Sequence, residues 1–228
     1  DRRIDAANPR TADRPLVSGR VAPRTAWVGA SVALAILVIA AWQLGPLPLR
    51  LLPGALIFLV GYPYTKRFTW LSHYILGFTD GLAPVGAWVA VRGSLFTIED
   101  LPAWLLLGVV TLWIGGFDLI YACQDADFDR DHCLQAIPAR FGTATALKLS
   151  SASHLGAIAL LLGLGAVATL SWPYAAGVVV VAGMLVVEHR IVKPGDLSRL
   201  DVAFFQINSA ISLTLLASVL VALAIEPV

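Results

Sequence analysis

Long apolar stretches separated by short polar segments dominate this chain. Seven of them approach the roughly 20 residues that an α-helix needs to cross a bilayer. They cover residues 26–42, 47–63, 70–91, 101–122, 143–168, 173–188 and 202–225. The pattern therefore predicts an all-α integral membrane protein, a bundle of transmembrane helices that forms a single domain over residues 1–228.

Composition and charge support this prediction and suggest an orientation. The chain is 58% hydrophobic and only 14% charged, which is far from the average soluble domain. If the spans alternate in direction, the hydrophilic segments 1–25, 64–69, 123–142 and 189–201 share one side, and all basic residues except Arg50 and Arg92 lie on or beside it. By the positive-inside rule, we expect a multi-pass protein of the cell (inner) membrane whose charged loops face the cytoplasm.

An acidic run at the end of the fourth span carries the first candidate chemistry. On one continuous helix, Asp118, Tyr121, Asp125 and Asp129 would lie within about 80° of one another, and the remaining acids of the run would point away into solvent. An ordinary hydrated loop is the alternative, but it does not account for an acid at position 118, inside apolar sequence. Acidic residues inside spans usually face a cavity and mark function.

A second carboxylate pair, Asp1 and Asp5, has the same i, i+4 spacing. Two such pairs predict a site for hard cations, since Mg²⁺ binds through one or two carboxylates together with water and phosphate oxygens. Lys66 and Arg67 end the second span on the same side and could hold phosphate, or could simply anchor the span at the interface. We expect neither a disulfide nor a zinc site at Cys123 and Cys133.

Taken together and in order, these motifs resemble a known family. The signature elements are Asp1-x3-Asp5, Tyr62-x3-Lys66, and Asp118-x2-Tyr121-x2-Gln124-Asp125-x3-Asp129 followed by Ile137-Pro-Ala-Arg-Phe-Gly142. They resemble those of the UbiA superfamily of intramembrane prenyltransferases. The segments 66–70, 83–88 and 203–208 are most similar to 4-hydroxybenzoate polyprenyltransferases and their relatives in menaquinone synthesis.

The resemblance implies a nine-helix bundle around a cavity open to lipid. With seven spans here, we expect residues 1–228 to lack the first helix of the family domain and most of the second. Cys133, Gln135 and Ala136 depart from the family pattern, which affects the loop after the second acidic motif rather than the metal site.

The resemblance also implies an activity. A polyprenyl group would pass from polyprenyl diphosphate to an aromatic acid acceptor, 4-hydroxybenzoate or a similar ring, in ubiquinone or menaquinone biosynthesis, by Mg²⁺-assisted ionisation and electrophilic substitution. The other partner is the lipid bilayer, and no nucleic acid is expected. The implied residues are Asp1, Asp5, Asp125 and Asp129 for metal; Tyr62, Lys66, Arg67 and Arg140 for diphosphate; and Asp118, Tyr121 and Asp80 near the reacting groups.

Several alternatives stay open from the sequence. Asp80 precedes Pro84 by one turn, so its carboxylate could polarise the acceptor or could hydrogen-bond the backbone that Pro84 frees. Asp118 and Tyr121 could face the acceptor ring or position the diphosphate. The whole chain could instead be a cation-coupled membrane transporter, since intramembrane carboxylates also relay ions, or an inactive fragment of the enzyme.

Overall fold

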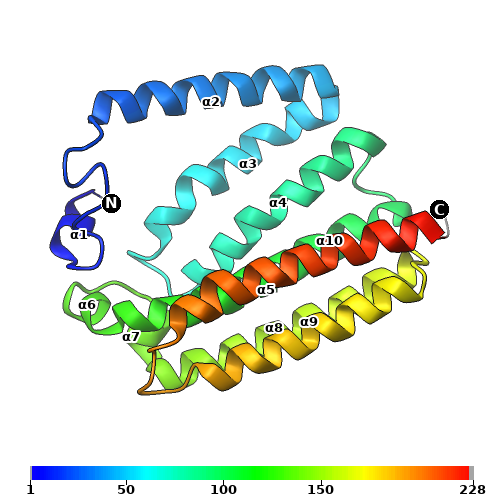
Figure 1. The fold of residues 1–228 in the computed structure, drawn as a ribbon. Coiled ribbons are helices and arrows are strands. Elements are labelled where there is room, and N and C mark those ends of the chain that lie inside the picture. The colour runs from blue at the N-terminus through cyan, green and yellow to red at the C-terminus, as the bar shows by residue number, and fades with distance from the viewer. Residues whose placement is uncertain (1, 226–228) are drawn as a thin grey trace.

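The computed structural model describes residues 2–225, apart from the side chain of residue 204, and they form a bundle of roughly parallel and antiparallel helices (Figure 1). Within this range there is no named strand, and seven helical segments are long and apolar enough to cross a membrane. The long helices are α2 (Pro23–Leu44), α3 (Pro46–Thr65), α4 (Ser72–Arg92), α5 (Leu101–Ala122), α8 (Thr143–Val167), α9 (Trp172–Ile191) and α10 (Asn208–Ile225). The predicted fold class is confirmed.

Short helical elements cap the long ones. They are α1 (Arg2–Ala7), η1 (Ile98–Asp100), η2 (Cys123–Asp125), α6 (Ala126–Asp131), α7 (Ile137–Phe141) and η3 (Val202–Ile207), of which η3 is a π-helix that leads into α10. One sequence expectation needs correction here. The acidic run is not one continuous helix, because η2 tightens the backbone between α5 and α6.

Proline and glycine set several helix boundaries. Pro23, Pro46 and Pro173 stand in the first turn of α2, α3 and α9, where the missing N–H costs nothing. Gly93 ends α4 in the left-handed conformation, with φ of 69°.

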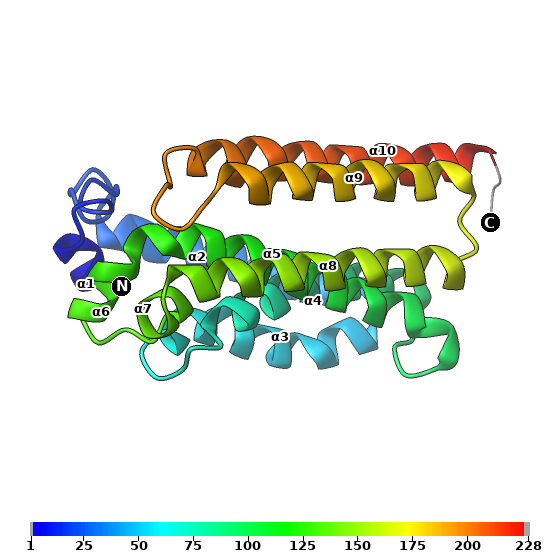
Figure 2. The same cartoon turned by 90° about the horizontal axis from the view of Figure 1, so that it is seen from below.

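Small residues allow the central helices to approach closely. A Cβ atom on Gly77 of α4 would overlap the backbone carbonyl of Thr111 in α5, and one on Gly116 of α5 would overlap the ring of His154 in α8. This close packing of small residues is typical of membrane helix interfaces. In a second view, α9 and α10 form a layer beside α5 and α8 (Figure 2).

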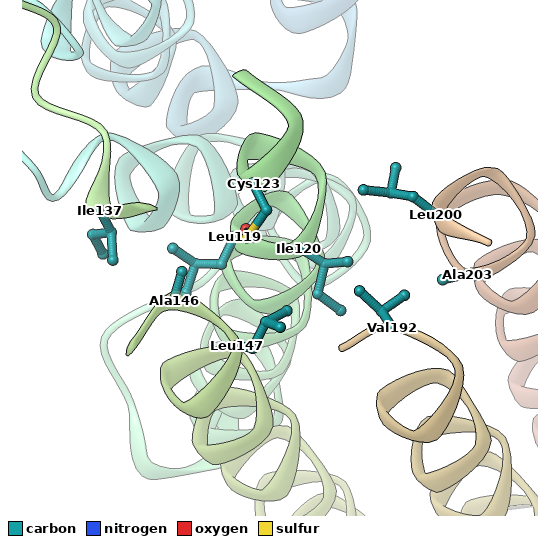
Figure 3. Close-up of a cluster of buried hydrophobic side chains, with 9 residues drawn as sticks. All are labelled: Leu119, Ile120, Cys123, Ile137, Ala146, Leu147, Val192, Leu200 and Ala203. Carbon is teal, nitrogen blue, oxygen red and sulfur yellow. Dashed lines mark hydrogen bonds between the residues drawn. The ribbon is translucent and has the colours of Figure 1, made fainter. Parts of the chain in front are cut away.

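A buried apolar cluster fixes the end of the bundle that carries the acidic run (Figure 3). Leu119 and Ile120 of α5 are almost fully buried, and they are joined by side chains from α7, α8 and the α9–α10 connection. The remaining members are Cys123, Ile137, Ala146, Leu147, Val192, Leu200 and Ala203. The cluster therefore ties the segments around residues 118–137 to the rest of the bundle.

The spans alternate in direction, which is the condition under which the basic residues share one side (Figures 1 and 2). The short helices α1, α6 and α7 and the α3–α4 and α9–α10 connections gather at one end of the bundle, whereas η1 and the α8–α9 connection lie at the other (Figures 1 and 2). The α2 helix at the edge exposes apolar side chains such as Trp27 and Ile36, as expected of a surface that faces lipid.

Candidate active site

A polar cavity of about 130 Å³ opens at the charged end of the bundle. Its walls come from α1 and the loop after it, the end of α3, and the η2–α6 segment. Among the lining side chains are two carboxylates and four cations: Asp5, Asp125, Arg10, Arg14, Lys66 and Arg67. The cavity thus brings together one carboxylate from each acidic motif, Asp5 and Asp125, and the basic end of the second span.

Asp125 is held by the segment that follows α1. Asn8 Nδ2 donates to Asp125 Oδ1 over 3.0 Å, and Arg10 makes a bidentate pair through Nε at 2.9 Å and Nη2 at 2.5 Å. Arg10 Nη1 also donates to the hydroxyl of Tyr121 over 2.7 Å. The hydrogen bonds from Arg10 to Asp125, together with the negative charge of that carboxylate, raise the pKa of Arg10. Partial burial of Arg10 acts in the opposite direction.

Asp129 lies one turn further along and is fully buried. Lys66 Nζ lies 2.8 Å from Asp129 Oδ1, while Oδ2 has no hydrogen-bond partner among residues 2–225. A buried carboxylate oxygen without a partner is costly, so it points to a group that completes the site.

The structure describes one of the two acids of the first motif, Asp5. Asp5 accepts a hydrogen bond from Arg14 Nη1 over 2.9 Å and lines the cavity beside Asp125. Asp1, the other predicted metal ligand of this motif, lies outside the described residues. The three predicted metal ligands that the structure describes, Asp5, Asp125 and Asp129, are therefore each paired with a cationic side chain.

The chemistry of these donors fits Mg²⁺. No group of three or more acidic, histidine or cysteine side chains converges within residues 2–225. Mg²⁺ does not need one, because it binds through one or two carboxylates and fills its other positions with water and substrate phosphate. Asp125 at the cavity wall and the unpartnered Oδ2 of Asp129 supply hard oxygen donors of this kind.

Asp118 is placed deeper in the bundle. It lies about 10 Å from Asp125 along the helix direction at 1.5 Å per residue. Its Oδ2 is 2.6 Å from Nδ1 of His73, a buried residue of α4. Asp80 is close enough to Asp118 for their charges to interact, and no hydrogen bond of its side chain is found in residues 2–225. A side-chain bond from Asp80 to the backbone freed by Pro84 is thus not observed.

The other predicted diphosphate ligands divide into two groups. Arg67 lines the cavity, with its guanidinium 5.0 Å from the centre of the Tyr64 ring. Tyr62 and Arg140 do not line it. The Arg140 side chain is exposed and lies 5.3 Å from the centre of the Phe141 ring.

Sequence reasoning missed four residues that organise this region. Asn8 and Arg10 hold Asp125, Arg14 holds Asp5, and His73 holds Asp118. A signal for the two arginines was present, because both stand in a basic segment directly after the first acidic motif. Nothing in the local sequence distinguishes His73.

The fold and the site together define a multi-pass membrane enzyme with a polar, acid-and-base-lined cavity at one end. The model of the UbiA prenyltransferase family matches residues 1–210, and the chain belongs to this family. It is a prenyltransferase, as the resemblance of its motifs implied.

Individual relatives agree with this assignment. The chain is 31% identical over 222 residues to a 4-hydroxybenzoate octaprenyltransferase of Methylobacillus flagellatus, covering 96% of this chain and 73% of that protein. The apo structure of a UbiA homolog from Aeropyrum pernix K1 matches with a TM-score of 0.85 and 35% identity, over 97% of this chain and 80% of that one. A digeranylgeranylglyceryl phosphate synthase, at TM-score 0.69 and 16% identity, shares the fold over 97% of this chain and 77% of its own.

Proposed function

We propose that this chain transfers a polyprenyl group from polyprenyl diphosphate to an aromatic acid acceptor, 4-hydroxybenzoate or a similar ring, in quinone biosynthesis. The observation that carries the proposal is the cavity that two carboxylates and four cationic side chains line together. A diphosphate with bound cations needs both kinds of ligand. The acceptor class is supported by the name of the Methylobacillus relative.

The donor diphosphate would bind at this cavity. Lys66 and Arg10 would turn from Asp129 and Asp125 towards the phosphate oxygens, with Arg67 and Arg14 adding positive charge at the rim. Asp125 and Asp129, with the first acidic motif, would then hold Mg²⁺. The ion would supply positive charge against the developing charge of the leaving diphosphate.

The chemical step would take place deeper, beside Asp118. The allylic C–O bond breaks, its electron pair leaves with the diphosphate, and the electron-rich ring forms the new C–C bond and then loses its proton. Tyr121 is bonded to Arg10 and so belongs to the diphosphate side of the site. Asp118 and Asp80 lie on the acceptor side, where a carboxylate can orient a phenolic hydroxyl and accept the released proton.

The position of the cavity suits an amphipathic donor. The charged end of the bundle would lie at the cytoplasmic surface, and the polyprenyl tail would extend along apolar helix surface, where each buried methylene contributes about 0.8 kcal/mol. The tail therefore needs no polar recognition.

The test is transfer by the purified chain in lipid nanodiscs. We expect Mg²⁺-dependent formation of prenylated ring from a polyprenyl diphosphate and labelled 4-hydroxybenzoate, with a bicyclic hydroxynaphthoate as the competing acceptor. Benzoate without the hydroxyl is the control, because it lacks the electron density for attack. Transfer to no aromatic acid, together with cation flux when the chain is placed in sealed vesicles, would favour the transporter instead.

A further inference from the structure

His73 joins three elements of the bundle through its two ring nitrogens. It is 4% exposed and belongs to α4. Its Nδ1 lies 2.6 Å from Asp118 Oδ2 on α5, and the backbone N–H of Ile137, at the start of α7, donates to its Nε2 over 3.3 Å. Residues far apart in sequence are thus connected at a single imidazole.

The contact with Ile137 determines the protonation of the ring. An amide N–H can only donate, so Nε2 must be the unprotonated acceptor and Nδ1 must carry the proton that is donated to Asp118. Because both nitrogens are engaged, His73 has no free lone pair with which to take a proton from substrate.

The contact also completes the start of α7. The first N–H groups of a helix lack internal acceptors, and Ala136, which precedes α7, offers no side-chain acceptor. His73 supplies one. The position of the Ile137–Phe141 segment is therefore coupled to the position of Asp118.

One oxygen of Asp118 remains available. Its Oδ2 is held by His73, while Oδ1 has no hydrogen-bond partner in the described part of the chain, and about a quarter of the side chain is exposed (24%). A carboxylate fixed at one oxygen and open at the other is suited to orient a ligand hydroxyl.

We propose that His73 is a positioning residue for prenyl transfer: it fixes the rotamer of Asp118, so that the open oxygen binds the hydroxyl of the aromatic acceptor, and it locks α7 to the same point. The inference rests on the proposed function for the identity of the acceptor. His73 itself touches no substrate and acts through Asp118.

Kinetics measured separately for each substrate distinguish an effect on the aromatic acceptor from an effect on the diphosphate donor. In the full chain, His73→Leu should lower kcat/KM for 4-hydroxybenzoate at least about 10-fold, the scale seen when residues that orient a functional ligand are removed. The donor KM should change less than about twofold. His73→Gln should recover most of the loss, since glutamine offers one donor and one acceptor. Equal effects on both substrates, or no recovery with Gln, would overturn the proposal.

A matched control and a double variant separate positioning from packing. Thr79→Val removes another buried polar group of α4, one whose hydroxyl donates to Ile75 O inside the helix, and should leave the acceptor KM unchanged. In an Asp118→Ala background, His73→Leu should cost less than about twofold more, because its effect passes through Asp118. Additive losses would overturn the proposal.

The tautomer of His73 can be measured independently of enzyme activity. The chain has four histidines, so ¹⁵N NMR of the imidazoles, assigned with His73→Gln, can report the tautomer of His73. The Nδ1–H form is expected. The Nε2–H form would contradict the proposed contacts of His73 with Asp118 and Ile137, even if the leucine variant fails to fold. If the wild-type chain prenylates no aromatic acid, the proposed function fails, and the role of Asp118 in binding the acceptor fails with it. The tautomer still tests whether His73 holds Asp118 and α7.

Discussion

Asp100 and Asp129 are fully buried carboxylates at opposite ends of the bundle, and they are satisfied in different ways. At the end opposite the cavity, Asp100 accepts hydrogen bonds from Trp88 Nε1, Ser94 Oγ and both the N–H and the hydroxyl of Thr97, all between 2.8 and 2.9 Å. At the cavity end, Asp129 has Lys66 at one oxygen and no hydrogen-bond partner at the other within residues 2–225.

The difference lies in the kind of partner. Asp100 is surrounded by neutral donors, most of them within six residues in sequence, that complete a capping box at the start of η1. Asp129 depends on one long cationic side chain, that of Lys66 at the end of α3. A complete set of short donors stabilises one structure, whereas an incomplete set leaves an oxygen available for a ligand. If this contrast holds, changes at the cavity end should have large effects on turnover and a change at Asp100 should have a small one.

Removal of divalent cations should have the largest effect. A chelator should abolish prenyl transfer, and added Mg²⁺ should restore it, because the charge of the leaving diphosphate would otherwise be only partly neutralised. Turnover is measured with polyprenyl diphosphate in nanodiscs, and thermal stability serves as the control, since the Asp100 end needs no metal. Full activity in the presence of chelator would exclude the Mg²⁺ role.

Asp125→Asn and Asp129→Asn should each lower turnover at least about 100-fold, the scale of losing one preorganised charged group at a reacting centre. Both should fold, because Arg10 and Lys66, the cations that lose their carboxylate partners, keep 31% and 37% of their side chains exposed to solvent and stay hydrated. Asp127→Asn is the matched control. Its side chain is 92% exposed on the same short helix, and its activity should stay within about twofold. Normal turnover in either Asp125 or Asp129 variant would contradict the assignment.

Lys66→Ala and Arg67→Ala should weaken donor binding much more than acceptor binding. Charge-assisted bonds to phosphate contribute about 1.5–3 kcal/mol each, so we expect the donor KM to rise by about 10-fold or more. Arg130→Ala is the control, because Arg130 is exposed and pairs with Asp127. If both substrates lose affinity equally, or neither does, the two bases anchor the span at the membrane interface instead.

The sequence predicted the fold well because long apolar runs define membrane spans directly. The predicted span 101–122 coincides with α5, and 143–168 differs from α8 by one residue. The sequence did not predict that the last span, 202–225, begins with a π-helix over residues 202–207 before α10. Helical periodicity does not distinguish these two kinds of helix.

The candidate site was predictable only where its residues follow one another. The spacing of Asp125 and Asp129 is a local pattern, and their side chains do lie near the same cavity. The partners Arg10 and Asn8 stand 115 and 117 residues from Asp125, and His73 stands 45 residues from Asp118. Such pairs are decided by how helices pack, and no short-range pattern encodes them.

Asp100→Ala should have the smallest effect on turnover and the clearest effect on stability. The substitution leaves the donors of Trp88, Ser94 and Thr97 without the acceptor that they share, so the turn that leads into η1 loses the hydrogen bonds that hold it. We therefore expect a Tm several degrees lower, with kcat within about twofold of the wild type once the fraction of folded protein is equal. The Tm of Asp100→Asn should lie between those of the wild type and Asp100→Ala, because the amide oxygen keeps some of the hydrogen bonds. The measurement is thermal unfolding in nanodiscs beside steady-state kinetics. A large loss of kcat at unchanged Tm would show that the carboxylate at this end also acts in the reaction, and the contrast with Asp129 would then be wrong.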